Sequence, residues 1–498
     1  MLSKVFARIL SLLMRGLMDN LESALERGHV PEIPKSEIGK VYMTRGSANG
    51  KPALVQRDRH HLIHPQHHPS EHQDPHIWVS GKGVTLTNIE GKSYLDGLSG
   101  MWNVYAGHGR PELVKAAAAQ LKTLAFATAY AGSTNLQAIE LARTLKKLVY
   151  GNIEAFYFTL GGSDATDTSI RTARFYWGAK GRPQKLKIIA RQLSYHGSTV
   201  GAASATGVDE FSQGFGPRLP GFLHIDSPNP YRFTTSRKDV SPGVAAADLL
   251  EELILREGPE TVAAFIAEPV QGGGGGVLVP PDDYFPRIRE ICDRYDVLLI
   301  SDEVITGFGR TGRWFALEHW GVQPDIVQFA KGITSGYFPL GGIGVSKAIK
   351  ETLDTVESGK RWWHGYTASA HPVGCAVALA NLAIIQKEGL VKRSARLGAR
   401  LLKGLRGLQE HPHVGDVRGL GLLVGIELVA DKKTKARFPA ERAIGKRLRQ
   451  ELFARGLYTR VLDEVICLAP PLVISEKEID RMVRIVTEAV TAVVGSGK

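Results

Sequence analysis

The sequence predicts an α/β protein built on a mostly parallel sheet, and two observations carry this prediction. From about Trp102 onward, short apolar runs of strand length alternate with amphipathic runs of helical length, which is typical of parallel sheets covered by helices. The expected strands are Glu154–Leu160, Leu186–Ala190, Val262–Ala267, Val297–Ser301, Ile326–Phe329 and Ile343–Val345. Helical runs at 164–178 and 283–294 separate several of them. Ligands collect at the carboxyl ends of strands in such sheets, so functional side chains are expected there.

Composition and length are those of a globular protein with two or more domains. The chain has 498 residues, of which 43% are hydrophobic and 22% charged. No apolar run approaches the roughly 18 residues of a membrane-spanning helix, so no membrane partner is expected. The three cysteines, Cys292, Cys375 and Cys467, lack metal-ligand spacing. This favours a reducing compartment, the cytoplasm, and no disulfide framework.

The formal net charge is +12. A basic balance can indicate nucleic-acid binding, but Arg and Lys are spread over helical runs such as 392–406 and 442–455, without a basic stripe interleaved with aromatic residues. A positive charge also suits an anionic cofactor and anionic substrates. The second interpretation is favoured, and no nucleic-acid partner is expected.

The first eighteen residues form a basic, acid-free segment that is amphipathic at helical spacing. This pattern is compatible with a transit peptide or an interfacial membrane helix. It has no clear small-residue cleavage site for secretion. The favoured interpretations are a start codon upstream of the true start at Met18, or an arm that packs on a partner.

Residues 31–75 are rich in proline, glycine and histidine and are expected to form an extended connector, not a helix. Seven histidines fall close together in the chain: His60, His61, His64, His67, His68, His72 and His76. A metal site is one interpretation. However, Glu71 and Asp74 do not complete a regular ligand spacing and no cysteine is near, so no metal is expected.

A lysine in a glycine-rich segment, Lys331, follows the expected strand Ile326–Phe329. A lysine held against a partly desolvated pocket has a lowered pKa and a nucleophilic amine, which suits a Schiff base with an aldehyde cofactor. Asp302 stands at the end of another expected strand. A fixed carboxylate keeps a pyridine nitrogen protonated, as pyridoxal phosphate requires to act as an electron sink. A surface lysine and an N-capping aspartate are the ordinary alternatives, and the pairing favours the cofactor site.

The segment Phe158–Ala165 has the pattern of a strand end, a glycine turn and a helix start, with Gly162 and Ser163 in the turn. Free backbone amides at a helix N-terminus, together with a serine hydroxyl, form an anion site without any cationic side chain. Ser163 is also a good helix N-cap in its own right. The two interpretations are compatible, and the turn is a candidate phosphate site.

Two stretches, Ser301–Gly312 and Ala330–Gly332, resemble the signature of the class-III aminotransferases, which are omega-aminotransferases of the type I pyridoxal-phosphate fold. The resemblance runs from about His64 to Ile485. It implies a large domain with a mostly parallel seven-stranded sheet and a smaller α+β domain. The implied divisions are an N-terminal arm over 1–40, the N-terminal part of the small domain with the active-site entrance over 41–100, the large cofactor-binding domain over 101–370 and the C-terminal small domain over 371–498.

The resemblance implies pyridoxal 5'-phosphate as cofactor, with Lys331 as the catalytic residue. The implied cofactor contacts are Gly162, Ser163, Tyr195, His196, Glu268, Gln271, Asp302, Val304, Lys331 and Thr367. Tyr195 matches the residue that stacks on one face of the pyridine, and Val304 matches the one that packs on the other. Gln271 matches the residue beside the ring hydroxyl, and Glu268 one near the substrate carboxylate. A tyrosine or valine at a strand end is otherwise usually a core residue.

The resemblance also implies a homodimer with shared active sites, with a tetramer as an alternative. Thr367 matches a residue that reaches the neighbouring subunit's phosphate. Arg460 matches a mobile arginine that pairs with a substrate carboxylate, the alternative being a surface arginine on an edge strand. Trp102, Tyr195 and the partner subunit's Tyr130 match substrate-pocket positions, although a tryptophan can equally fill a core. Gln66, His67 and His68 stand where many relatives carry an aromatic, which predicts a more polar pocket rim.

The expected reaction is transfer of an amino group from a primary amine or omega-amino acid to a keto acid, with pyruvate as the expected acceptor. The sequence does not identify the amine, which can be an omega-amino acid, a diamine such as putrescine, a taurine-like compound or a long or hydroxylated amine. The alternatives are another pyridoxal-phosphate reaction on the same fold, namely an aminomutase, racemase or decarboxylase, or a non-catalytic scaffold.

Overall fold

The computed structural model describes residues 50–66 and 68–495. The chain divides into two compact units, Met1–Trp78 and Val79–Lys498. The expectations for the first eighteen residues, for an arm over 1–40 and for His67 lie outside the described residues. The expected domain divisions stay a prediction.

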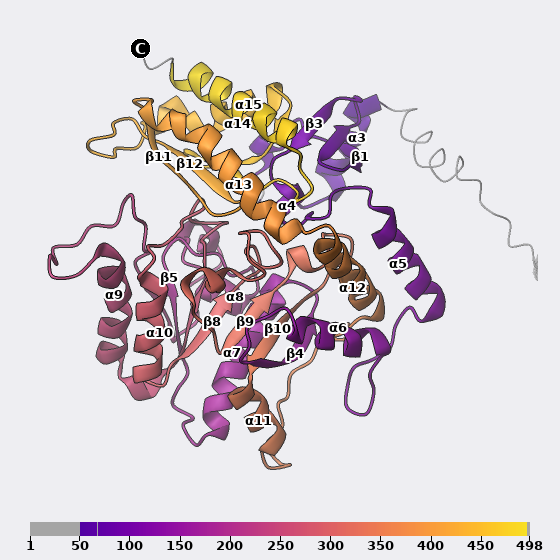
Figure 1. Cartoon of the computed structure of the whole chain (residues 1–498), viewed down its shortest axis with the longest axis vertical. Helices are drawn as coiled ribbons and strands as arrows, with labels where there is room; N and C mark the ends of the chain where they lie inside the picture. Colours follow the sequence, from indigo (N-terminus) through magenta and orange to yellow (C-terminus); the bar gives the residue numbers. More distant parts are fainter. Residues whose placement is uncertain (1–49, 67, 496–498) are drawn as a thin grey trace, which may run out of the picture. The chain divides into compact units, whose positions relative to one another are not determined.

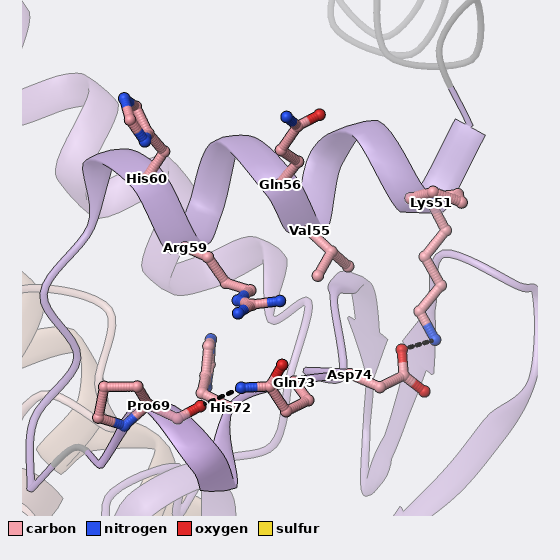
Figure 2. A pocket seen from close by; sticks show the side chains of 10 residues that line it. Lys51, Val55, Gln56, Arg59, His60, Pro69, His72, Gln73 and Asp74 are labelled. Atoms are coloured by element: carbon pink, nitrogen blue, oxygen red, sulfur yellow. Dashed lines mark hydrogen bonds and ion pairs between the residues drawn. The ribbon is translucent and has the colours of Figure 1, made fainter.

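In the first unit, helix α3 (Gly50–His61) is followed by a loop and the single-turn helix η1 (Pro69–Glu71) (Figure 2). The prediction of an extended connector over 31–75 is therefore wrong for residues 50–61. Pro52 falls in the first turn, where proline is tolerated, and the following residues include strong helix formers. The proline, glycine and histidine content of the whole stretch concealed this short helix.

The second unit is built on a seven-stranded sheet (Figure 1) in the order β4 (Ile153–Thr159), β10 (Gly341–Ser346), β9 (Ile326–Phe329), β8 (Leu298–Asp302), β7 (Val262–Ala267), β5 (Lys187–Arg191) and β6 (Phe222–Ile225). β10 runs antiparallel to both of its neighbours, and the other pairings are parallel. The predicted mostly parallel sheet is confirmed, with each expected strand present. β6 was not predicted, because it has four residues and a histidine in its middle.

Both faces of this sheet are buried. Along β7, Phe265 and Ile266 are each 0% exposed and belong to separate apolar clusters on opposite faces. One cluster includes residues of α9 (Pro242–Glu257) and α10 (Tyr284–Arg294), and the other residues of α7 (Gly162–Ala179) and α11 (Lys347–Thr355). Burial on two faces explains why the central strands are continuous apolar runs without polar alternation.

Further α-helices of the second unit are α4 (Ser99–Trp102), α5 (Pro111–Thr123), α6 (Leu136–Lys146), α8 (Val200–Ala205) and α12 (Pro372–Lys387). α12 packs against α5 and α6. Within the described residues, no single helix is long and apolar enough to cross a membrane. One pair bent by 61°, Pro372–Lys387 with Leu390–Glu410, passes that test by length and composition only.

Two smaller sheets complete the second unit. One has the order β1 (Trp78–Lys82), β2 (Thr85–Asn88), β3 (Ser93–Asp96), β13 (Leu457–Tyr458), and the other β11 (Val414–Gly419), β12 (Val424–Leu428), β15 (Val465–Leu468), β14 (Arg460–Leu462). Helices α13 (Leu390–Arg406), α14 (Ile444–Ala454) and α15 (Glu476–Val494) accompany them, with α15 against both α13 and α14 (Figure 1). The parallel pairing of β13 with β3 joins N-terminal and C-terminal segments in one sheet.

Candidate active site

The predicted site residues gather at one edge of the large sheet. Asp302 is the last residue of β8, and Lys331 follows β9 directly as the first residue of η5 (Lys331–Ile333). Other predicted residues follow β5, β7 and β4 in the same way. Because β5, β7, β8 and β9 are parallel, their carboxyl ends meet at the same edge. The sheet therefore brings residues far apart in sequence into one site.

Asp302 is fixed by two partners and is only 3% exposed. Its Oδ2 lies 2.7 Å from Nδ1 of His196, and its Oδ1 accepts the backbone N–H of Val304 at 3.1 Å. Since a carboxylate only accepts hydrogen bonds, Nδ1 of His196 carries the proton. His196 therefore orients the carboxylate, which retains lone pairs for a further donor such as a protonated pyridine nitrogen.

Lys331 has a backbone φ of 47°, which is uncommon for a residue other than glycine. Such a conformation costs on the order of 1 kcal/mol and persists where the surroundings enforce it. A Cβ on Gly332 would lie 2.3 Å from Cε2 of Tyr105, so the turn packs directly on that ring. Burial lowers the pKa of the Lys331 amine, the carboxylates of Asp302 and Glu268 oppose this, and the Arg460 guanidinium lowers the pKa further. The sequence predicted a lowered pKa at this lysine.

Glycines let neighbouring segments approach the start of α7 closely. A Cβ on Gly162 would come within 3.0 Å of Cγ1 of Val304. Ser163 Oγ accepts the backbone N–H of Ser198 at 3.1 Å, and a Cβ on Gly197 would meet that Oγ at 2.5 Å. The first helical amides and the serine hydroxyl thus lie together beside Val304. This arrangement suits an anion such as a phosphate.

Glu268 holds two neighbouring segments of the site. Its Oε1 accepts the backbone N–H of Tyr195 at 3.0 Å, and its Oε2 accepts that of Gly272 at 2.9 Å. Burial raises the pKa of this carboxyl, although His196 and the two amides oppose the rise. The carboxylate therefore orders the Tyr195 segment. Its predicted place near a substrate carboxylate stays a prediction.

The side chain of Gln271 has a hydrogen-bond acceptor that no described residue occupies. Its Nε2 donates to the Gln192 carbonyl at 2.9 Å, whereas its buried Oε1 has no hydrogen-bond partner within residues 50–66 and 68–495. A buried polar atom without a partner is costly unless a ligand satisfies it. A ring hydroxyl would supply the missing donor. The chain's groups therefore fit pyridoxal phosphate at its nitrogen, its phosphate and its hydroxyl.

Arg460 opens β14, the edge strand of its sheet. Its side chain makes no hydrogen bond or ion pair with any residue that the structure describes. Its charge nevertheless adds to the lowering of the Lys331 pKa that burial causes, and it partly offsets the rise that burial causes in the pKa of Cys467. The arginine lies on an edge strand, as its alternative interpretation requires, and its charge also lowers the pKa of Lys331.

The remaining predicted residues differ in how far they are exposed to solvent. Trp102 is 2% exposed and belongs to an apolar cluster with Val270 and Ile305, which supports the core-filling alternative. Tyr130 is 53% exposed, and a Cβ on Gly365 would lie 2.9 Å from its hydroxyl. Thr367 is also exposed. The structure therefore leaves Tyr130 and Thr367 accessible to a partner, whereas Trp102 is enclosed.

Two charged residues inside the quoted motif were assigned no role from the sequence. Glu303 is fully buried and accepts hydrogen bonds from the Tyr150 hydroxyl, from Thr306 and from the backbone N–H of Ala316. Its position directly after Asp302 in an otherwise apolar and glycine-rich stretch was the available signal. This carboxylate anchors the loop that follows the acid-bearing strand.

Arg310 is the second such residue. It is 0% exposed, donates to the carbonyls of Leu422 at 3.0 Å and Pro470 at 2.6 Å, and lies 4.4 Å from the ring centroid of Tyr105. Its guanidinium thereby ties the segments beside β12 and β15 to the site loop. Arg310 thus helps to position the sheet that carries Arg460.

Comparisons with known proteins agree with this site. The family model described as Aminotransferase class-III matches residues 67–490. A putrescine–pyruvate aminotransferase of Pseudomonas aeruginosa is 40% identical over 433 residues, covering 86% of this chain and 93% of that protein. Gamma-aminobutyrate transaminase 1, mitochondrial, of Oryza sativa subsp. japonica is 39% identical over 422 residues, covering 84% of this chain and 81% of that protein.

Solved structures show the same likeness. An (S)-enantioselective omega-transaminase from Thermomicrobium roseum has a TM-score of 0.86 and 47% identity, covering 89% of this chain and 99% of its own. The omega-transaminase of Pseudomonas jessenii in complex with PMP has a TM-score of 0.85 and 37% identity, covering 88% and 98%. The predicted type I fold, the cofactor pyridoxal phosphate and the transaminase activity are confirmed. The chain belongs to the class-III aminotransferase family.

Proposed function

We propose that this transaminase moves an amino group from a primary amine or omega-amino acid to pyruvate, at active sites shared between two subunits. The observation that carries the proposal is the Lys331 amine, whose pKa is lowered by burial beside the fixed carboxylate of Asp302 and within reach of the Arg460 charge. A relative that uses putrescine and pyruvate, and another named for gamma-aminobutyrate, support this substrate class.

The chain's residues divide the work of holding the cofactor. Lys331 would supply the amine for its aldehyde, Asp302 would accept a hydrogen bond from its ring nitrogen, and Gln271 Oε1 would accept one from its hydroxyl. The α7 N-terminus with Ser163 would hold its phosphate, and Tyr195 with Val304 would enclose its ring. When bound, pyridoxal phosphate supplies an electron sink for the bond cleaved at the amine-bearing carbon.

Lys331 is also the base that moves the proton. In its unprotonated form, which burial favours by lowering the pKa of this amine, its Nζ would accept the proton from the amine-bearing carbon of the donor. The same Nζ would pass that proton to the cofactor carbon that carried the aldehyde, and it would move a proton in the reverse direction when the keto acid is aminated. His196 contributes by holding Asp302 in one orientation through the 2.7 Å hydrogen bond, so the carboxylate needs no reorganisation during the proton transfer.

Arg460 determines how one site accepts both a carboxylate and an amine. A guanidinium grips a carboxylate with two parallel hydrogen bonds, and the Arg460 side chain has no competing ion pair within the described residues. It can therefore pair with the pyruvate carboxylate. A donor without a carboxylate would not pair with Arg460.

The proposed homodimer is supported by what the second unit exposes. Trp363 is 75% exposed and Tyr130 53%, and Thr367, near Trp363 in the chain, is also exposed. Aromatic residues are enriched at protein–protein interfaces relative to the rest of the surface. A Thr367 in the partner's phosphate site would make each active site depend on both chains. The proposed compartment is the cytoplasm, supported by three buried free cysteines.

A donor panel tests the proposal. Purified enzyme with pyridoxal phosphate is given pyruvate and one amine at a time, and alanine is quantified. The expected result is alanine formed in equal amount to the amine consumed. An amine converted without keto acid consumption would instead support the runner-up, another pyridoxal-phosphate reaction on this fold. No alanine with any of omega-amino acids, diamines, taurine-like amines and hydroxylated amines would overturn the choice of pyruvate.

A further inference from the structure

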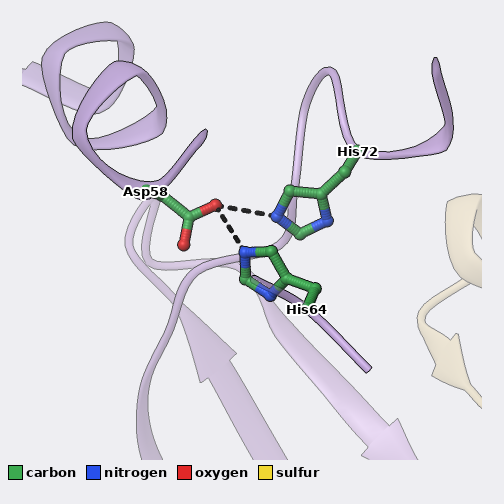
Figure 3. Close-up of side chains that lie close together, drawn as sticks. All are labelled: Asp58, His64 and His72. Carbon is green, nitrogen blue, oxygen red and sulfur yellow. Dashed lines mark hydrogen bonds and ion pairs between the residues drawn. The ribbon is translucent and has the colours of Figure 1, made fainter. Parts of the chain in front are cut away.

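Three side chains of the first unit converge on one point (Figure 3). Asp58 lies on α3, His64 in the loop after it, and His72 directly after η1. Oδ2 of Asp58 is 3.1 Å from Nε2 of His64 and 2.7 Å from Nε2 of His72. The two imidazole centroids are 3.8 Å apart, with ring planes at 31°. Both histidines thus aim the same ring nitrogen at the same carboxylate oxygen.

The donor atoms of this cluster have the spacing of a metal site. The three ligand atoms all lie within 4.8 Å of one another. Ligands around tetrahedral zinc, at about 2.0–2.1 Å from the ion, stand about 3.3 Å from each other. Side-chain movements of about 1 Å would therefore bring the three donors around one ion. No movement of the helix is required.

The residue types also select the ion. Imidazole nitrogen with one carboxylate oxygen suits a divalent transition ion of borderline softness such as zinc, whereas calcium and magnesium prefer oxygen alone. We propose that Asp58, His64 and His72 bind one divalent transition-metal ion, zinc being the ion of choice, with solvent completing the coordination. The Asp58 and His72 side chains are 20% and 23% exposed, and that of His64 is 26% exposed. The site is sheltered without being closed.

A cavity of about 650 Å³ gives the ion a route to this cluster. It lies between α3 and the loop around η1, and His72 forms part of its wall (Figure 2). Lys51 and Asp74 pair across it at 2.7 Å. The ion would replace the direct Asp58–His72 hydrogen bond as a second link between the same two segments. Because α3 has no buried residue, such a link would contribute a substantial part of what holds this helix in place.

A purely hydrogen-bonded cluster is the competing account, and zinc titration separates the two. Full-length protein carrying its cofactor and no affinity tag is stripped of metal with a chelator. Zinc is then added, with bound metal measured by equilibrium dialysis and elemental analysis. One zinc per chain is expected. Cobalt in its place should give the visible absorption of a site with nitrogen and oxygen ligands.

Variants locate the bound ion. Asp58→Asn and His64→Ala should each weaken zinc binding by more than about 100-fold, since even loss of an outer-shell partner costs roughly 10–100-fold. The matched control is the double variant His60→Ala/His61→Ala, which removes two exposed imidazoles at the end of the same helix and should bind zinc within about twofold of the parent. Loss of binding in the control with retention in His64→Ala would overturn the proposal.

A second measurement guards against variants that fail to fold. Hydrogen exchange of the amides in residues 50–74 is followed with and without zinc. Zinc should slow exchange there in the parent and in the control variant, but not in Asp58→Asn, whose exchange elsewhere in the chain should match that of the parent. A parent protein that binds no zinc, or whose exchange in 50–74 does not respond to bound zinc, would overturn the proposed site.

Discussion

The strand-end site of the second unit and the histidine cluster of the first unit both bring charged side chains together from separate segments, but different forces hold them. The strand-end residues stand on strands whose side chains are almost all buried on two faces. The cluster residues stand on a helix with no buried residue and on the loop after it. The packing of the sheet holds the strand-end residues in place, whereas the hydrogen bonds that Asp58 makes with His64 and His72 help to hold the cluster together.

This difference separates two kinds of function. A preorganised site can stabilise changing charge during a reaction, because its dipoles need not move. A site held mainly by its ligands is suited to binding an ion and gaining order from it. Substitutions in the strand-end site should therefore change rates while the fold survives, and substitutions in the cluster should change binding and local order.

The largest effect expected is at Lys331. Lys331→Ala removes both the amine that holds the cofactor aldehyde and the base that moves the proton, so steady-state transamination should fall to background. The sheet should remain intact, because the lysine makes no hydrogen bond with its side chain to any described residue. Alanine formation and thermal unfolding of the same preparation measure the two effects. Substantial turnover in Lys331→Ala would remove the basis of the proposed mechanism.

The next largest effect is expected at Asp302. Asp302→Asn keeps the size of the side chain but removes the charge beside the ring nitrogen. The rate of both half-reactions should fall by on the order of 10²–10³, as for other preorganised electrostatic partners. Bound cofactor, measured by its absorbance, should remain. His196→Gln is a companion variant that keeps a donor near Oδ2 and should lose less activity than Asp302→Asn. Near-parental rates in Asp302→Asn would contradict the electron-sink argument.

The third effect should fall mainly on one half-reaction. Arg460→Ala leaves the pyruvate carboxylate without its bidentate partner. Truncating a buried charge pair costs roughly 2–5 kcal/mol, and because Arg460 is partly exposed the lower end, about 2 kcal/mol or ~30-fold, is expected. Amine donors without a carboxylate should react almost as before. Single-turnover measurements of each half-reaction decide this, and equal losses in both would show a structural arginine.

The strand-end site could be predicted largely from sequence because its residues follow strands. Asp302 and Lys331 each follow an apolar run. Such runs are easy to recognise in a sequence, because the strands of a parallel sheet that is buried on two faces are continuously hydrophobic. Glu303 and Arg310 were not assigned, because their partners lie far away in the sequence or are backbone groups, such as the Tyr150 hydroxyl for Glu303 and the Leu422 carbonyl for Arg310, and the residue types alone reveal neither. Trp102 illustrates a related limit, since a pocket wall and a core position demand the same residue.

The histidine cluster was missed for a different reason. The sequence drew attention to Glu71 and Asp74 as acids near the histidines, whereas the carboxylate that meets His64 and His72 is Asp58. Asp58 reaches them because α3 is a helix, and the connector prediction had excluded a helix there. Because the helix was not predicted, Asp58 was not recognised as the carboxylate that meets the histidines. The strand-end residues did not suffer from this, because the strands that position them were predicted.

The smallest effect expected is a shift of the pH profile through Arg460. Lys331 must be unprotonated to accept a proton, so the half-reaction with an uncarboxylated amine should rise with pH through the lowered pKa of Lys331. The positive charge of Arg460 contributes to that lowering. Arg460→Met removes the charge with similar bulk, so the pKa of Lys331 should rise and the acid limb of the profile should move to higher pH. Arg460→Lys, which keeps the charge but not the bidentate grip, should leave the limb in place while still weakening pyruvate. An acid limb at the same pH in Arg460→Met and in the parent would show that the charge of Arg460 does not act on Lys331. Arg460, on β14, would then not be part of the preorganised strand-end site.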